Sequence, residues 1–284
     1  MITICSANLG TSSYLNLNWD LTVAALGRRP RWIVSDNDAP EITAIAGVSP
    51  LDPGFEVVEG VSKYYCIPRA QQLRVGANNV QHGLSLNNAV KKAIEYGDRY
   101  LLLLDPDFFI IPSLDTVIEY MQKKGLAYFG APYLSETPLV HNCPVAFCLF
   151  IDMEKRIPGP LNFEPGYFAP DDQVYPDVGC KVYQQFIDQP KLYDIALPSI
   201  PEGSELSWLN LRHTKSRFRV SYDNPANDKH TKIDEYFWKN DQPFGLHTRG
   251  KLNQARNQHK SRVDRQLETA RKVVTKSRTS IGLS

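Results

Sequence analysis

The segment Tyr100–Leu104 is a short apolar run that stops at Asp105-Pro106-Asp107. Such a run is typical of a strand buried on both faces, as in a parallel sheet that is covered by helices. Pro106 has no backbone N–H and cannot continue a central ladder, so the chain is expected to leave the sheet at this point. The pattern predicts an α/β fold, doubly wound around a mostly parallel sheet, with two carboxylates at its edge.

Strand and helix patterns alternate on both sides of this run. Strands are expected at 2–5, 32–34, 127–129 and 145–151. A first helix is expected in the stretch that contains Leu21 and Leu26, and a second from Ser85, its N-cap, to Gly97. Further helices are expected at 114–124, from Asp177 to Ile187, and from Leu252 to Lys276. No secondary structure is predicted for 208–250. We expect one domain at 1–250, with a nucleotide-binding half (1–110) and an acceptor half (111–250), followed by a helical C-terminal extension at 251–284.

The charge distribution is balanced except in this extension. With 32 basic and 31 acidic residues, the net charge of +1 gives no overall field that would recruit nucleic acid. From Lys251 onward there are nine Lys or Arg against Asp264 and Glu268. An apolar stripe shares the expected helix: Val263, Leu267, Ala270 and Val274. Peripheral contact with an anionic membrane and packing on the domain or a second subunit both fit this helix, although the stripe lacks the Trp or Phe anchors of interfacial helices.

The location is inferred from the cysteines and the apolar runs. Five cysteines are an odd number, and the sequence starts at Ile2-Thr3-Ile4 without the pattern of a signal segment. No apolar run approaches the ~18 residues that a membrane span requires. We therefore expect a reduced, cytoplasmic protein that does not cross a membrane. The oligomeric state is left open.

The strongest chemical feature is the pair Asp105 and Asp107. Two carboxylates just beyond a buried strand repel one another and lose hydration unless a cation neutralises them. Oxygen ligands suit Mg²⁺ or Mn²⁺, and such an ion can bridge a diphosphate. The alternative is a plain turn in which Asp107 caps a neighbouring group and Asp105 is solvated.

The order of these motifs resembles the N-terminal half of family 2 glycosyltransferases, which have a GT-A fold. The matching stretches cover roughly residues 1–110: Ile2–Asn8, Ile33–Asn37, Asn87–Ala93 and Leu101–Asp107. Ala89 stands where that family usually has glycine, and 46–65 resembles an insertion. The resemblance implies a nucleotide-sugar donor, a divalent metal and inversion at the anomeric carbon.

The same resemblance implies roles for individual side chains. Ser6, Asn8 and Asp36 would line the nucleotide site, although ordinary turn chemistry at strand ends also explains them. Asn87 would lie near the base or ribose. Asp105 and Asp107 would hold the ribose and the metal.

Two downstream residues complete the expected site. Asp177 is similar in position to the family's catalytic base, but Pro176 replaces the usual acidic residue before it. Asp171 and Asp172 remain rival bases, and Asp177 also fits a helix N-cap. His247 lies where many GT-A enzymes place a histidine that completes the metal shell. A structural or merely exposed histidine is the alternative.

These observations predict a metal-dependent glycosyltransferase that moves a sugar from a nucleotide-sugar to a saccharide, lipid-linked or protein acceptor. A sugar-1-phosphate nucleotidyltransferase is the nearest enzymatic alternative, but its glycine-rich loop is missing, since no second glycine follows Gly10 until Gly27. A non-catalytic GT-A-like domain that binds a saccharide or partner is the other. The chain contains no G-x-G-x-x-G, Walker A or G-x-S-x-G motif.

Overall fold

The computed structural model describes residues 1–37, 50–61, 77–132, 143–168, 175–196, 220–221, 233–240, 242–248 and 260–283. Its main feature is a seven-stranded sheet with the order β10-β6-β7-β4-β1-β2-β3. The strands are β1 (Ile2–Asn8), β2 (Arg31–Asp36), β3 (Glu56–Glu59), β4 (Tyr100–Leu104), β6 (Tyr128–Gly130), β7 (Cys148–Asp152) and β10 (Tyr193–Ile195).

Most neighbouring strands of this sheet run in the same direction. β1 pairs in parallel with both β2 and β4, β2 with β3, and β6 with β10. β7 is the exception, because it runs antiparallel to β4 and β6. The predicted α/β class and mostly parallel sheet are therefore confirmed. The carboxyl ends of β1, β2 and β4 lie at one edge.

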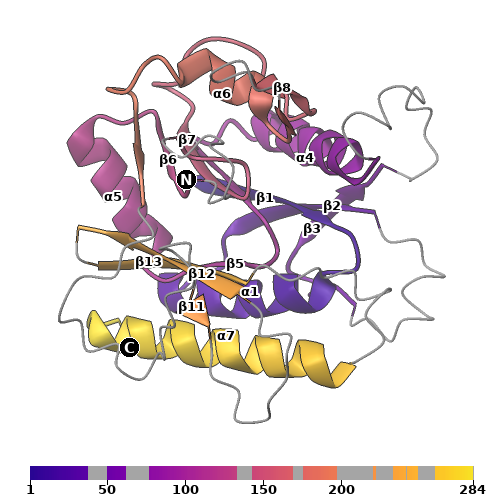
Figure 1. The fold of residues 1–284 in the computed structure, drawn as a ribbon, viewed down its shortest axis with the longest axis vertical. Coiled ribbons are helices and arrows are strands. Elements are labelled where there is room, and N and C mark those ends of the chain that lie inside the picture. The colour runs from indigo at the N-terminus through magenta and orange to yellow at the C-terminus, as the bar shows by residue number, and fades with distance from the viewer. Residues whose placement is uncertain are drawn as a thin grey trace.

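Helices cover both faces of the sheet. They are α1 (Ser12–Leu26), α4 (Ala77–Glu95), α5 (Leu114–Lys124), α6 (Cys180–Phe186) and α7 (Lys260–Ser280). Figure 1 shows α4 and α6 on one side of the sheet and α1, with α7 beyond it, on the other. The predicted bounds of α5 agree with the structure, because Ser113 caps its first turn and Gly125 ends it in the left-handed conformation.

Two predicted helix starts are wrong. α4 begins at Ala77, so Ser85 lies inside the helix, where its hydroxyl donates to the carbonyl of Gln81 (2.7 Å). This bond back to the preceding turn replaces the expected cap. α6 begins at Cys180, whereas Asp177 ends the strand β9 (Tyr175–Asp177). Asp177 is therefore not the N-cap of this helix.

Two regions without a predicted pattern contain strands. β3 lies inside the insertion-like segment 46–65 and extends the large sheet at its edge. The unassigned segment 208–250 contains β11 (Val220–Ser221), β12 (Ile233–Lys239) and β13 (Gln242–Thr248). These three strands form a second sheet with β5 (Phe108–Ile110), which directly follows Asp107. A hairpin from late in the sequence thus pairs with the segment that carries the acidic motif.

The C-terminal helix shares a core with the rest of the molecule. Its buried residues Val263, Ala270 and Val274 belong to an apolar cluster with side chains of α1, β5, β12 and β13. Leu267 packs partly buried against the same cluster. Of the two interpretations of the apolar stripe, the structure shows packing on the domain. Within the described residues, no helix is long and apolar enough to span a bilayer.

Candidate metal and nucleotide site

The site is built from polar residues that end neighbouring parallel strands. Asn8 ends β1 and Asp36 ends β2, and the two residues lie opposite one another in the strand register. The amide nitrogen of Asn8 donates to Oδ1 of Asp36 (2.9 Å), while its amide oxygen accepts from the backbone and hydroxyl of Thr11. Asn8 therefore joins the start of α1 to Asp36 at the sheet edge.

The motif Asp105-Pro106-Asp107 carries the chain from one sheet to the other. The backbone N–H of Asp105 donates to the carbonyl of Phe147 (2.9 Å), and the N–H of Phe108 donates back to the carbonyl of Asp105 (3.1 Å). β4 ends before this turn, and β5 begins after it in the second sheet. As predicted from Pro106, the chain leaves the large sheet where the two carboxylates stand.

The second sheet brings His247 to these carboxylates. In β13, His247 pairs with Phe108, and the N–H of Thr248 donates to the carbonyl of Asp107 (3.0 Å). Nε2 of His247 lies 3.4 Å from Oδ1 of Asp107. The side chain of His247 is 9% exposed and stacks on Phe147, with ring centroids 4.7 Å apart. Backbone pairing and ring stacking together hold the histidine against the acidic motif.

The donor set fits a divalent cation. One ligand atom from each of Asp105, Asp107 and His247 lies within 4.8 Å of the other two. Two hard carboxylate oxygens and an imidazole nitrogen are suitable ligands for Mn²⁺ or a similar ion. A cation would also offset the repulsion between two partly buried carboxylates. The sequence placed these three residues in one site, and the structure brings them together.

His82 is a site residue that the sequence did not predict. It lies on α4, and its Nε2 is 3.3 Å from Oδ1 of Asp105. Each carboxylate of the motif thus has a histidine beside it. The expected start of the helix at Ser85 left His82 outside the element, so no face could be assigned to it. A longer helix, starting at Ala77, would have placed His82 on the surface that faces the sheet.

Two predicted nucleotide contacts are not supported by the geometry. Ser6 is fully buried, and its hydroxyl donates to the carbonyl of Leu104 (2.6 Å) and accepts from the indole of Trp32 (3.0 Å). The amide of Asn87 contacts Asn162 and accepts from the backbone N–H of Phe163 (2.7 Å). Ser6 thus forms hydrogen bonds within the core below the sheet edge, and Asn87 attaches the loop that contains Phe163 to α4.

That loop leads to Asp177. Gly83 of α4 allows the close approach of residues 163–164, because an added Cβ would lie 2.4 Å from the carbonyl oxygen of Phe163. The chain then forms β8 (Gly166–Phe168), in which Gly166 pairs with Asp177 of β9. The backbone of Asp177 is therefore attached to a loop that packs beside His82. The rival bases Asp171 and Asp172 lie outside the described residues.

No protein-family model matches the chain, and no curated protein matches it. Similar solved structures include the galactosyltransferase LgtC with donor and acceptor sugar analogues, at 19% identity and a TM-score of 0.35, over 55% of this chain and 59% of that one. Mouse xyloside xylosyltransferase 1 is 12% identical, with a TM-score of 0.39, over 68% and 83% of the two chains.

A third match is the mannosyltransferase of Pyrobaculum calidifontis in complex with GDP-Man and Mn²⁺, at 11% identity and a TM-score of 0.31, over 54% of this chain and 44% of that one. The chain thus spans 59% of the length of LgtC and less than half of the mannosyltransferase. All three similarities are distant, and the chemistry of the site must be inferred from this chain's own residues.

Proposed function

We propose that this protein is a GT-A-like glycosyltransferase that moves a sugar from a nucleotide-sugar donor to an acceptor hydroxyl with the help of a divalent cation. The observation that carries the proposal is the convergence of Asp105, Asp107 and His247 beside the carboxyl edge of a parallel sheet. Ligands of open α/β sheets bind at this edge, where strand ends present polar groups. A cation at this edge would neutralise the diphosphate of such a donor, and the polar strand ends would bind its nucleoside.

Different residues at the sheet edge would bind different parts of the donor. Asp105, Asp107 and His247 would hold Mn²⁺ or Mg²⁺, which when bound would neutralise negative charge on the departing nucleoside diphosphate. Asp36, held by the amide of Asn8, presents a carboxylate that suits the hydroxyl groups of a ribose. His82 holds Asp105 from the side of α4.

We propose Asp177 as the base that deprotonates the acceptor. The supporting observation is a series of backbone contacts from α4 through residues 163–166 to β9, which attaches Asp177 beside the helix that carries His82. An acceptor hydroxyl activated there would attack the face of the anomeric carbon opposite the leaving diphosphate, so the configuration would invert. The acceptor, whether saccharide, lipid-linked or protein, would bind in the half formed by 111–250.

The two alternatives differ in what they bind and release. A sugar-1-phosphate nucleotidyltransferase would consume a nucleoside triphosphate and release diphosphate. A non-catalytic domain would bind a saccharide or partner without turnover. The buried histidine beside two carboxylates forms a donor set for a cation, and a cation suits the release of a nucleoside diphosphate.

The decisive experiment is a thermal-shift screen of nucleotide-sugars and nucleoside triphosphates, each with and without Mn²⁺. We expect stabilisation by at least one nucleotide-sugar only when Mn²⁺ is present, because a ligand of the native state raises its apparent stability. Slow hydrolysis of that donor, measured as release of the nucleoside diphosphate, would distinguish an enzyme from a binding domain. If the protein is stabilised only by a nucleoside triphosphate together with a sugar-1-phosphate, and by no nucleotide-sugar, the nucleotidyltransferase is favoured.

The role of Asp177 is tested by Asp177→Asn. The amide cannot accept the acceptor proton, so we expect turnover to fall by a factor on the order of 10² or more, while Mn²⁺-dependent donor binding is nearly unchanged. Asp171→Asn and Asp172→Asn are the matched controls. Near-normal turnover in Asp177→Asn with loss in one of the other two would move the base to that residue.

A further inference from the structure

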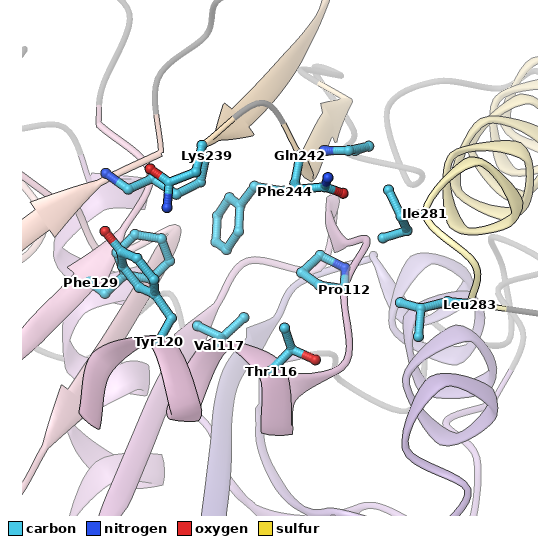
Figure 2. A pocket seen from close by; sticks show the side chains of 12 residues that line it. Pro112, Thr116, Val117, Tyr120, Phe129, Lys239, Gln242, Phe244, Ile281 and Leu283 are labelled. Atoms are coloured by element: carbon cyan, nitrogen blue, oxygen red, sulfur yellow. The ribbon is translucent and has the colours of Figure 1, made fainter. Parts of the chain in front are cut away.

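A pocket of about 360 Å³ lies at the far end of the β12–β13 hairpin, away from the metal ligands. It is bounded by α5, by the end of the hairpin and by the residues that follow α7 (Figure 2). Gln242 lines this pocket, whereas His247 lies at the other end of β13. At ~3.3 Å per residue, the strand separates the two by roughly 16 Å. The pocket is therefore distinct from the proposed donor site.

The floor of the pocket is apolar. Phe129, Val117 and Phe244 are buried side chains that line it. In Figure 2, the ring of Phe244 stands between Phe129 on one side and Pro112 on the other, and Ile281 lies beyond Pro112. An apolar cavity of ~150 Å³ is large enough for benzene. This pocket therefore has room for a six-membered ring that carries a substituent of several atoms.

One end of the pocket is polar but electrically balanced. The ammonium of Lys239 donates to Oδ1 of Asp194 and to the carbonyl of Ile195 (2.9 Å). The hydroxyl of Tyr120 also donates to Asp194. Burial alone would raise the pKa of Asp194, but the hydrogen bonds from Lys239 and Tyr120 hold it below its usual value. The carboxylate is therefore ionised at neutral pH and compensates the charge of Lys239.

The remaining polar side chains among the described residues that line the pocket are uncharged. Thr116, Asn240 and Gln242 line the opening with a hydroxyl and two amides. Lys239 uses two of its three N–H groups in the hydrogen bonds to Asp194 and Ile195. The third can donate to an acceptor in the pocket. Among the described residues that line the pocket, a charged ligand would find no uncompensated counter-charge, whereas a neutral donor–acceptor group would find several partners.

We propose that this pocket binds a small uncharged molecule with one aromatic or alicyclic ring and a hydroxyl- or amide-bearing substituent. The ring packs on Phe244 and Val117, and the polar group hydrogen-bonds to Lys239 and the rim amides. Because the walls come from α5, the hairpin and the chain after α7, the ligand contacts three separate parts of the fold. The proposal does not depend on the glycosyltransferase function.

The test uses 2-phenylethanol as the probe and NMR of the full chain with labelled Ile, Leu and Val methyl groups. We expect saturable shifts at Val117, Ile281 and Leu283, with a millimolar Kd that is typical of so small a ligand. Methyl glucoside, which is polar all around, should leave these methyl groups unchanged. Absence of saturable shifts with 2-phenylethanol, or tighter binding of the glucoside at the same methyl groups, would overturn the proposal.

Two substitutions test whether 2-phenylethanol binds in this pocket. Ile281→Trp and Thr116→Phe place a larger side chain in the pocket from different elements, and each should weaken 2-phenylethanol binding by at least tenfold. Ile94→Trp is the control, because Ile94 is exposed on α4 and does not line the pocket. If Ile281→Trp does not fold, Thr116→Phe on the surface of α5 still decides the question. Unchanged affinity in a folded filling variant would place the probe elsewhere.

Discussion

At the scale of single residues, Asp107 has separate roles for its backbone and its side chain. Its carbonyl accepts two hydrogen bonds from Thr248, through the backbone N–H (3.0 Å) and the hydroxyl (3.3 Å). Its carboxylate faces His247. The backbone bonds hold the end of β13 in place whatever the side chain is. The carboxylate can therefore be removed without releasing the strand.

Asp107→Ala should abolish the Mn²⁺-dependent binding of a nucleoside diphosphate while leaving the fold intact. The substitution removes a hard ligand and also relieves repulsion with Asp105. Calorimetric titration with and without Mn²⁺ measures the effect. Asp115→Ala, at a surface ion pair with Arg28, is the matched control and should bind as the wild type does. Unchanged metal-dependent affinity in folded Asp107→Ala would remove the metal assignment.

A second, independent prediction concerns His82. Its imidazole lies beside Asp105, so His82→Ala should leave that carboxylate free to take other rotamers. We expect Mn²⁺-dependent donor affinity to fall by a factor of roughly 10 to 100, the range for partners that hold metal ligands in place. His82→Gln, which keeps a hydrogen-bond donor, should recover part of the loss. Equal losses in both variants, or none in either, would contradict a positioning role.

At the scale of elements, the strand that carries His247 depends on the C-terminal helix. α7 packs against β13, β5 and α1, and these contacts form an apolar cluster behind His247 and Asp107. Arg278, near the end of α7, is buried and donates to the carbonyls of Ile110, Ile111 and Leu21 at 3.1, 2.8 and 2.7 Å. One guanidinium therefore joins β5, the segment after it and α1.

Arg278→Met should lower the free energy of unfolding by roughly 2 to 4 kcal/mol, because three buried carbonyls lose their donor while the desolvation cost of the cation is relieved. Burial lowers the pKa of this guanidinium. Denaturant unfolding measures the change. Arg271→Met on the same helix removes only an exposed ion pair with Asp20 and should cost less than about 0.5 kcal/mol. Equal losses of stability in the two variants would contradict a specific structural role for Arg278.

At the scale of the whole molecule, α7, which is the described part of the basic C-terminal segment, belongs to the folded body. Its apolar residues face α1 and the second sheet, so they are not available to enter a lipid surface. Lys272 and Arg271 remain exposed, but Glu268 and Asp20 pair with them. The excess of positive charge in the sequence is therefore partly compensated by neighbouring acids in the structure.

We expect the full-length protein to stay in the supernatant when it is centrifuged with anionic liposomes at low salt. Without an inserted apolar face, only exposed basic residues could attract the lipid, each by about 1 kcal/mol and in a salt-sensitive way. Sedimentation at low salt that is reversed at high salt would contradict this expectation. In that case, Lys272→Glu would show whether α7 provides the contact.

The sequence by itself determined the α/β class, the strand that ends at Asp105, the bounds of α5 and the identity of the three candidate metal ligands. The fold class, the strand, the bounds of α5 and the two carboxylates depend on local information: apolar runs, capping residues and carboxylate chemistry. Proline after a buried strand was enough to predict that Asp105 and Asp107 stand at the sheet edge. The family resemblance added His247, although 140 positions separate it from Asp107 in the chain.

Only the tertiary structure decided which side chains actually meet. The hairpin of β12 and β13 escaped prediction because its strands are mixed in polarity and because β13 pairs with β5, far away in the sequence. His82 was missed because the helix was expected to start at Ser85, and its contact with Asp105 depends on how α4 packs on the sheet. Ser6 and Asn87 were assigned to the site by position, yet their hydrogen bonds serve the core and a loop. Long-range pairing and side-chain direction are properties of the folded chain, and no local pattern encodes them.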